Sequence, residues 1–214
     1  MIKLQSISKS YGSIKVLEDF TFGFKAGDTV CILGHSGSGK STLLKLIALI
    51  TKPDRGSLTI DGRNINGLNE AELEELRREK IAYSFQEPLL IPYMTALENL
   101  TEVIEVQNGK AVELLSQLGL SNRLNHQPSK MSVGEKKRVD IARAVLKKSV
   151  LLVVDEPLSS LDPATSLKVM ALLRKHAEAG GIVVYSSVEP SDARFAGRVI
   201  NMSIICAQAN NSVT

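Results

Sequence analysis

Short apolar segments alternate with longer amphipathic segments along most of this 214-residue chain. The apolar segments at residues 29–33, 81–85, 150–154 and 182–185 have the length and the β-branched content of buried parallel strands. Amphipathic stretches with helical spacing lie between them, and the first of these begins directly after residue 42. Strands that alternate with helices in this way indicate a mostly parallel sheet with helices on both of its faces.

Two regions depart from this alternation. The N-terminal region contains strand-like pieces at residues 2–7, 14–17 and 20–24 with turn residues between them, which predicts an antiparallel layer. A mainly helical stretch at residues 95–148 interrupts the strands, which predicts an inserted helical subdomain. The last strand is predicted at residues 198–205.

These patterns predict one α/β domain over residues 1–214. Its core would comprise residues 1–86 and 150–206, and the helical subdomain would comprise residues 87–149. The expected fold therefore has a mostly parallel core sheet, an N-terminal antiparallel β layer and an inserted set of helices.

The composition is that of an ordinary globular protein, with 43% hydrophobic and 23% charged residues. The formal net charge of +3 is too small to indicate a nucleic-acid partner, and none is expected. The basic residues at 136–138 and 147–148 lie on predicted helices, so we interpret both clusters as solvated faces. Cys31 and Cys206 lie in apolar, strand-like runs and are predicted to be buried thiols, as in a reducing cytosol.

The strongest chemical signal is the segment that follows the strand at residues 29–33. It fits the pattern G-x-x-x-x-G-K-[ST], in which backbone N–H groups cradle phosphate oxygens and the next helix adds its positive dipole end. Lys40 would reach the β- and γ-phosphates, and the Ser41 hydroxyl would coordinate Mg²⁺. The chain is therefore expected to be a P-loop NTPase that binds a nucleoside triphosphate. The predicted binding residues in this loop are Gly34, His35, Ser36, Gly37, Ser38, Gly39, Lys40, Ser41 and Thr42.

A second signal is the pair Asp155 and Glu156, which directly follows an apolar run. The carboxyl end of a parallel strand is where ligands bind in an open α/β sheet. Asp155 is placed to hold Mg²⁺, directly or through water, and Glu156 is placed to orient or deprotonate the attacking water. No Asn-Lys-x-Asp guanine-binding motif occurs in the chain, so a GTPase is disfavoured.

The segment Met131–Arg138, which reads MSVGEKKR, lies between these two signals. It resembles the L-S-G-G-Q signature of the nucleotide-binding subunits of ATP-binding-cassette transporters, with Ser132 and Gly134 retained. Gln86 matches the glutamine of that family's Q-loop, and Ser159–Asp162 matches its D-loop. The resemblance extends over essentially the whole chain, with the motifs in the expected order.

The resemblance implies ATP as the nucleotide and Mg²⁺ as its cofactor. It also implies that Ser132 and Gly134 contact ATP bound to a facing subunit, so that two cassettes, identical or different, form a head-to-tail dimer with shared sites. Gln86 would bind Mg²⁺ or the attacking water and act in catalysis with Glu156. Tyr11 matches the family's adenine-stacking aromatic, although an aromatic residue here can also serve only in packing.

Three segments also have a purely structural interpretation. Ser132-x-x-Glu135 is a capping box, which would begin a helix in any protein. Asp162 followed by proline is an ordinary helix start, while the resemblance also assigns Asp162 to the dimer interface. The apolar loop at residues 88–94 either packs into the core or, as the resemblance implies, forms a groove for a coupling helix of a membrane subunit.

The resemblance thus implies the ATP-hydrolysing subunit of a transporter, which drives membrane-spanning permease subunits and works in some systems with a substrate-binding protein. No apolar run is long enough to span a bilayer and no signal peptide is evident, so the membrane role would depend on these partners. The expected location is cytoplasmic, peripheral on the inner face of the cell membrane. The sequence is more similar to importer-type or stand-alone cassettes than to fused exporters. Repair and translation ATPases are disfavoured, because the sequence holds neither a long coiled-coil insertion nor a second cassette.

Two positions depart from the family pattern. Val133 replaces the first glycine of the signature, which should weaken or shift the contact across the dimer. Alignment of the last strand places Ser187 where the family has its switch histidine, and serine is shorter and uncharged. With Glu156 present, we expect slow but real ATP hydrolysis, with Ser187 in that catalytic position. The alternative is an ATP-dependent dimerising scaffold or regulatory cassette with little hydrolysis.

Overall fold

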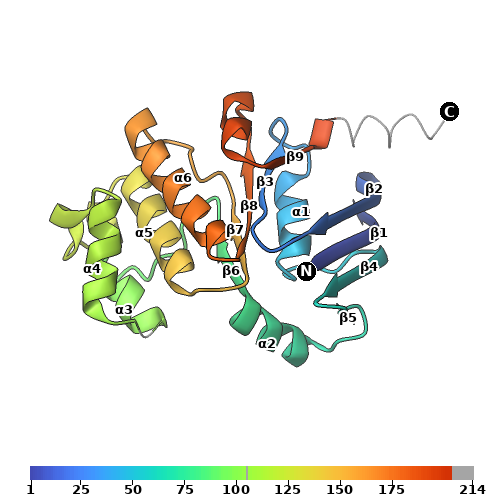
Figure 1. Cartoon of the computed structure of the whole chain (residues 1–214), viewed down its shortest axis with the longest axis horizontal. Helices are drawn as coiled ribbons and strands as arrows, with labels where there is room; N and C mark the ends of the chain where they lie inside the picture. Colours follow the sequence, from blue (N-terminus) through green and yellow to red (C-terminus); the bar gives the residue numbers. More distant parts are fainter. Residues whose placement is uncertain (105, 204–214) are drawn as a thin grey trace.

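A parallel sheet forms the centre of the computed structural model, which describes residues 1–104 and 106–203 (Figure 1). Its strand order is β6-β7-β8-β3-β9, and every neighbouring pair is parallel. The predicted parallel core sheet is therefore confirmed. The strands are β6 (Ile81–Ser84), β7 (Leu151–Val154), β8 (Ile182–Ser187), β3 (Thr29–Leu33) and β9 (Arg198–Asn201).

A second sheet is antiparallel and has the strand order β2-β1-β4-β5. The predicted N-terminal antiparallel layer is confirmed, although the pieces expected at residues 14–17 and 20–24 form one continuous strand. The strands of this sheet are β1 (Ile2–Tyr11), β2 (Ile14–Phe24), β4 (Arg55–Ile60) and β5 (Arg63–Asn64).

Helix α1 (Lys40–Ile47) lies between the two sheets (Figure 1). Its apolar side chains share one core cluster with Leu4 of β1, Leu58 of β4 and Ile32 of β3. The residue before Ile32, Cys31, belongs to the core cluster on the other face, so both faces of the parallel sheet are buried. Helix α1, which follows the phosphate-binding loop, is thus held in place by packing against both the parallel and the antiparallel sheet.

Helices α5 (Val133–Leu146) and α6 (Pro163–Glu178) cover the other face of the parallel sheet. Helices α3 (Glu98–Ile104) and α4 (Asn108–Gln117) lie beyond α5, on the side away from the antiparallel sheet (Figure 1). Helix α5 connects these inserted helices to the sheet, because it packs on α3 and α4 as well as on β6 and β7. The other helical segments are α2 (Glu70–Lys80), η1 (Ser121–Arg123), η2 (Pro128–Lys130) and η3 (Pro190–Phe195).

Cys31 is a fully buried free thiol, as predicted, and burial raises its pKa to about 11. Cys206 and the last two residues of the strand predicted at 198–205 lie outside the described residues. Within the described ranges, no helix has both the length and the apolar character needed to cross a membrane.

The interpretation of the basic residues near α5 as solvated faces is wrong for Lys137, whose side chain lies almost entirely out of solvent at 2% exposure. Lys147, just after the end of the helix, is also partly buried. Both ammonium groups donate hydrogen bonds to backbone carbonyl groups of neighbouring segments. A lysine in a charged run can therefore bury its side chain and bond backbone carbonyl groups through its ammonium group. Composition alone does not reveal this.

Glycine is required where β4 passes close to an irregular part of β1. Gly56, in β4, has a φ of 87°, and a Cβ atom there would lie 2.3 Å from the backbone carbonyl oxygen of Ser6. Gly62 has a similar φ of 83°, but no atom lies within 4 Å of the position of its Cβ. The two glycines thus share a backbone conformation and differ in the space around them.

We predict that Gly56→Ala lowers the free energy of unfolding more than the matched control Gly62→Ala. The control should lose about 1–2 kcal/mol from the left-handed backbone alone. Gly56→Ala should lose about 3 kcal/mol or more, because β1 must also move away from β4. Urea unfolding followed by circular dichroism measures both values, and equal losses would contradict a role for the β1–β4 contact.

Candidate functional site

The loop between β3 and α1 has the compact shape of a phosphate-binding loop. Gly37 and Gly39 adopt left-handed φ angles of 78° and 87°, which favour glycine. The Lys40 side chain is 5% exposed, and its Nζ donates hydrogen bonds to the carbonyl oxygens of Gly34 at 2.9 Å and His35 at 3.0 Å. The predicted order of strand, loop and helix is therefore present, with the lysine folded over the loop.

A cavity of about 240 Å³ lies beside this loop and also contacts segments far away in the sequence. Gln86, which follows β6, and Glu156, which follows β7, both reach it. Their side chains approach each other, with Gln86 Nε2 3.4 Å from Glu156 Oε2. The fold thus brings the loop, the glutamine and the glutamate to one place. The lining residues are Val16, Ser36, Gly37, Gly39, Lys40, Ser41, Thr42, Gln86 and Glu156.

Asp155 lies at the carboxyl end of β7, next to this cavity, and is 3% exposed. Its Oδ1 accepts a hydrogen bond from Ser186 Oγ at 2.5 Å, and Ser186 Oγ in turn accepts one from the backbone N–H of Glu156 at 2.8 Å. Glu156 has a φ of 49°, an uncommon conformation for a residue other than glycine that is often found at functional sites. The Ser186 hydroxyl therefore holds both the aspartate side chain and this strained backbone.

Ser186 was missed by the sequence reasoning. It lies fully buried in β8, after the apolar residues Ile182–Tyr185. A signal for it was present, because a serine inside a buried apolar strand needs a hydrogen-bond partner, and the nearest candidates follow the neighbouring strand. The identity of that partner depends on which strand lies next to β8, and the sequence does not show this.

Ser187, the predicted counterpart of the switch histidine, is 5% exposed and faces η3. Its hydroxyl donates to Asp192 Oδ2 at 2.6 Å and accepts from the backbone N–H of Glu189 at 3.0 Å. Its carbonyl oxygen accepts a hydrogen bond from the N–H of Gly34 at 3.2 Å. Ser187 thus touches the nucleotide loop through its backbone and is not one of the described residues that line the cavity. Its catalytic role stays a prediction.

The signature segment begins helix α5, and its predicted capping box is confirmed. Ser132 Oγ accepts from the backbone N–H of Glu135 at 3.2 Å, and the Ser132 N–H donates to Glu135 Oε2 at 2.8 Å. Arg123 Nε donates to the other carboxylate oxygen at 2.7 Å. The hydrogen bonds from Arg123 and then Ser132 hold the pKa of Glu135 below its usual value. The acid therefore stays ionised and fixes the start of the helix.

The other signature residues differ in how much space surrounds them. Val133 is 64% exposed at the first position of α5. Gly134 lies against the D-loop segment, because a Cβ atom there would be only 3.0 Å from the Ser160 carbonyl oxygen. Neither Ser132 nor Gly134 lines the cavity at the phosphate-binding loop within the described part of this chain. Their predicted contact with ATP therefore requires a second subunit.

The surroundings of Tyr11 are compatible with packing and with adenine stacking. Those of Asp162 are compatible with a helix start and with a dimer contact. Tyr11 is 50% exposed at the end of β1, so its ring is accessible for stacking. Asp162 is the N-cap of α6, with its Oδ1 accepting from the backbone N–H of Thr165 at 2.9 Å. The predicted helix start is confirmed, and the dimer contact of Asp162 stays a prediction.

The apolar loop at residues 88–94 is partly exposed. Leu89 and Tyr93 are 58% and 72% exposed, so the alternative of a loop packed wholly into the core is wrong. The buried Asn99 holds the loop from α3: its Oδ1 accepts from the Ile91 N–H at 2.7 Å, and its Nδ2 donates to the Ile91 carbonyl at 3.2 Å. The loop is thus anchored at its centre while two large apolar side chains face outward.

The predicted metal ligands fit Mg²⁺ by their chemistry. Ser41, Gln86 and Asp155 offer a hydroxyl, an amide oxygen and a carboxylate, and Mg²⁺ prefers oxygen ligands. Mg²⁺ is usually bound by one or two carboxylates together with substrate phosphates and water. Among the described residues, no group of three or more histidine, cysteine or acidic side chains is placed to hold a metal ion.

The sequence profile of the family described as ABC transporter matches residues 17–159, which include the phosphate-binding loop, the signature and the Asp155–Glu156 pair. The chain belongs to the ABC transporter family. The cassette is 38% identical over 216 residues to the "Uncharacterized ABC transporter ATP-binding protein MJ0796" of Methanocaldococcus jannaschii. The alignment covers 94% of this chain and 92% of that protein.

Solved structures of ABC cassettes have the same fold. The dimeric post-hydrolysis state of MJ0796 bound to ADP and Pi matches the cassette with a TM-score of 0.86 and 36% identity, over 94% of each chain. The Macrolide export ATP-binding/permease protein MacB of Photorhabdus laumondii is 36% identical over 214 residues, which is 94% of this chain and 33% of MacB. The cassette therefore spans about a third of the length of MacB.

We predict that Ser186→Ala lowers the ATPase rate of the cassette about tenfold. The change leaves Asp155 Oδ1 and the N–H of Glu156 without their buried partner, a loss of about 1–3 kcal/mol at the predicted metal ligand and the predicted base. The matched control is Ser149→Ala, because Ser149 is also buried and bonds a backbone carbonyl at the opposite end of β7. Steady-state phosphate release measures both, and equal rates in the two variants would contradict the role of Ser186.

Proposed function

We propose that this cassette is the ATP-hydrolysing subunit of a transporter, which closes with a second cassette on Mg·ATP and drives membrane-spanning partner subunits. The observation that carries the proposal is the cavity at the phosphate-binding loop, where Gln86 and Glu156 meet the loop residues. A loop that only bound nucleotide would need neither a glutamine nor a carboxylate beside the γ-phosphate position.

Each polar group at the cavity has a role in this proposal. Lys40 and the loop N–H groups bind the β- and γ-phosphates, and Ser41, Gln86 and Asp155 hold Mg²⁺. The metal ion supplies charge neutralisation on the phosphate oxygens. Glu156 orients the attacking water and accepts its proton. Hydrolysis then depends mainly on positioning and electrostatics, as expected for phosphoryl transfer.

The second cassette supplies what one chain lacks. The N-terminus of α5, where Ser132 and Val133 are exposed, carries the positive end of a helix dipole, which suits a γ-phosphate bound by the facing subunit. The related protein MJ0796 has been solved as a dimer, and one of its structures is bound to ADP and Pi. These observations support a head-to-tail dimer with two shared sites.

The partners in the membrane would dock on the side of the inserted helices. The exposed Leu89 and Tyr93 offer an apolar surface directly after Gln86, so an event at the nucleotide reaches this surface through a few residues. With such partners the cassette would lie on the inner face of the membrane. MacB is named as a macrolide export protein, but the similarity lies in the cassette third of its length and supports the motor rather than a substrate or a direction of transport.

A dimerising scaffold with little hydrolysis is the second candidate function. Two observations favour it: the exposed Val133 at the start of α5 and the Ser187 hydroxyl that is bound to Asp192. The first would hold the facing phosphate away from the helix, and the second leaves one catalytic position without a side chain aimed at the cavity. Both candidates require ATP-dependent dimerisation and differ in turnover.

We predict that Glu156→Gln lowers kcat by about a hundredfold or more, because it removes the general base. The variant should still bind Mg·ATP and should accumulate as a dimer, since the amide keeps the shape of the side chain. Phosphate release and size-exclusion chromatography with light scattering measure the two properties. Glu178→Gln, at the exposed end of α6, is the matched control and should behave as the wild-type protein.

The same measurements separate the two candidate functions. A wild-type rate clearly above that of Glu156→Gln supports the motor. A wild-type protein that dimerises on ATP but hydrolyses it no faster than Glu156→Gln is a scaffold. A wild-type protein that does neither contradicts both proposals.

We predict that Val133→Gly strengthens the ATP-bound dimer about tenfold when it is combined with Glu156→Gln. Removing the branched side chain lets the α5 backbone approach the facing phosphate, and about 1.4 kcal/mol corresponds to tenfold in the dissociation constant. Val133→Thr keeps the branched shape and is the control, with an unchanged dimer. The dissociation constant comes from analytical ultracentrifugation, and equal values for the glycine and threonine variants would show that Val133 does not restrict the contact.

A further inference from the structure

Lys137 occupies an unusual place for a lysine. It lies on the second turn of α5 and is 2% exposed. Its Nζ donates hydrogen bonds to the carbonyl oxygens of Phe85 at 2.8 Å, Gln86 at 3.3 Å and Asp155 at 2.5 Å. An ammonium group has three donors, so these three carbonyl groups use its full capacity.

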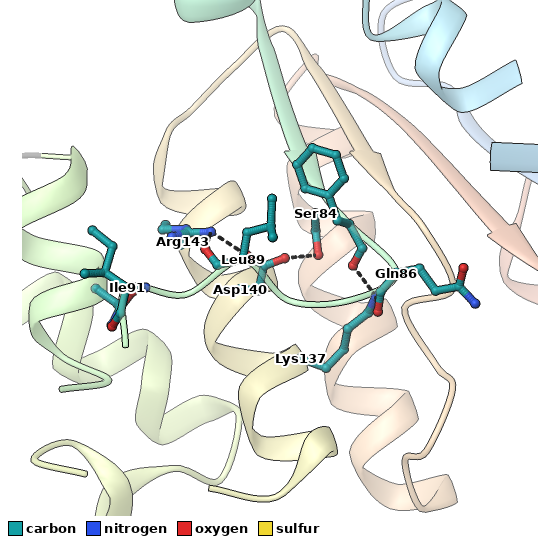
Figure 2. Close-up of polar contacts among 9 residues, drawn as sticks. Ser84, Gln86, Leu89, Ile91, Lys137, Asp140 and Arg143 are labelled. Atoms are coloured by element: carbon teal, nitrogen blue, oxygen red, sulfur yellow. Dashed lines mark hydrogen bonds and ion pairs between the residues drawn. The ribbon is translucent and has the colours of Figure 1, made fainter. Parts of the chain in front are cut away.

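The three carbonyl groups mark the point where β6 and β7 separate. The pairing of the two strands ends at Ser84 and Val154, followed by one more hydrogen bond from the Asp155 N–H to the Ser84 carbonyl at 2.9 Å. Beyond it, the chain after Gln86 runs toward Leu89 and Ile91 on the side of the inserted helices (Figure 2). Asp155 is followed by Glu156, which lines the cavity. The Lys137 ammonium bridges the two backbones where they no longer bond each other.

This position is costly for a positive charge. Lys137 makes no ion pair within the described part of the chain. Its hydrogen bonds go only to backbone carbonyl groups. Burial lowers its pKa, and the negative charges of Asp140, Asp155 and Glu156 act in the opposite direction. A buried ammonium without a carboxylate partner is a poor way to gain stability, because desolvation offsets much of the benefit. Its placement is therefore better explained by what it holds in position.

The same face of α5 contacts the neighbouring segment at two further points, the Ser84 side chain and the Leu89 backbone. Figure 2 shows Lys137, Asp140 and Arg143 reaching from the helix toward the segment that carries Gln86. Asp140 Oδ2 accepts from Ser84 Oγ at 2.6 Å, and Arg143 Nη2 donates to the Leu89 carbonyl oxygen at 2.6 Å (Figure 2). Residues three apart lie on one side of a helix, so the three side chains act as one row. Lys137 is the member of the row that also reaches Asp155, directly after β7.

The contacts of Lys137 fix the relative position of two side chains at the cavity. It binds the carbonyl of Gln86 itself and the carbonyl of Asp155, whose next residue is Glu156. The Gln86 and Glu156 side chains approach to 3.4 Å. Misplacement of such groups by about 1 Å can cost a hundredfold in rate. Loss of the bridge would let the Gln86 segment move relative to Glu156 without disturbing the phosphate-binding loop.

We propose that Lys137 is a positioning residue for ATP hydrolysis, whose buried ammonium clamps the Gln86 backbone to the Asp155 backbone and so sets Gln86 against Glu156. The inference rests on the proposed motor function of the cassette. It assigns Lys137 no contact with ATP, because the residue lies behind the two strand ends and does not line the cavity among the described residues.

The test compares Lys137→Met with Lys147→Met in the full chain. Lys147 is a matched control, because its Nζ also donates to backbone carbonyls, those of Arg77 at 3.0 Å and Ile81, at the opposite end of β6 from the site. Lys137→Met should lower kcat about tenfold or more, with the KM for ATP within about threefold of wild type because the loop is intact. The apparent KM for Mg²⁺ should rise, because Gln86 is displaced. Lys147→Met should lower Tm but leave kcat and both KM values unchanged.

Lys137→Gln is the conservative variant and keeps two N–H donors without the charge. Its kcat should lie between those of the wild type and Lys137→Met, and it carries the test if the methionine variant does not fold. The proposal is overturned if folded Lys137→Met has the same kcat and the same KM for Mg²⁺ as Lys147→Met. If Lys137→Met does not fold, the same comparison is made with Lys137→Gln. It is also overturned if the loss lies only in the KM for ATP.

Failure of the proposed function gives a different result. If wild type and Glu156→Gln hydrolyse ATP equally slowly, the motor function fails and with it the role of Lys137 in hydrolysis. If wild type is active and Glu156→Gln is not, the motor function stands, and the comparison of Lys137 with Lys147 decides the positioning role alone.

Discussion

The parallel pairing of β6, β7, β8 and β3 is the constraint on which the rest of the site depends. Because these strands run in one direction, the segments that follow them leave the sheet at one edge. Strand β8 lies between β7 and β3, so Ser186 bonds Asp155 on one side while the Ser187 carbonyl bonds Gly34 on the other. The register is fixed by burial, since a slip of one residue would exchange the side chains of the two core clusters.

Polar groups are buried along this edge, and Lys137, Asp140 and Ser186 each bond more than one neighbour. Burial raises the pKa of Asp140, while the hydrogen bond from Ser84 and the charges of Arg143 and Lys137 oppose that effect. Removing one member of such a network leaves the desolvation cost of the others uncompensated. Burial of these polar groups therefore lowers the free energy of unfolding, but their hydrogen bonds allow few alternative arrangements of the backbone between β6 and α3. That restriction is what catalysis by positioning requires.

Helix α5 connects the parts of the cassette that lie far apart. Its N-terminus carries the signature, with Val133 exposed. One of its sides holds the backbone around Gln86, and the helix also packs on α3 and α4. A helix of this length moves nearly as a rigid body, because its backbone hydrogen bonds are made within it. A contact with a facing nucleotide at Ser132, the position of Gln86 and the exposed surface at Leu89 are thus tied to one element. This connection gives a physical route between the proposed ATP contact and the proposed surface for a membrane partner.

The sequence by itself determined the features whose geometry is local. The phosphate-binding loop, the capping box at Ser132, the N-cap at Asp162 and the acids after β7 each depend on a few consecutive residues, and the structure has them as predicted. The alternation of apolar and amphipathic segments also sufficed for the parallel sheet and the antiparallel layer. Only the tertiary structure decided that Ser186 bonds Asp155 and that Lys137 is buried, although its sequence neighbours indicated a solvated face. Both depend on the order of strands and on partners 18 to 52 positions away, which local patterns of polarity do not encode.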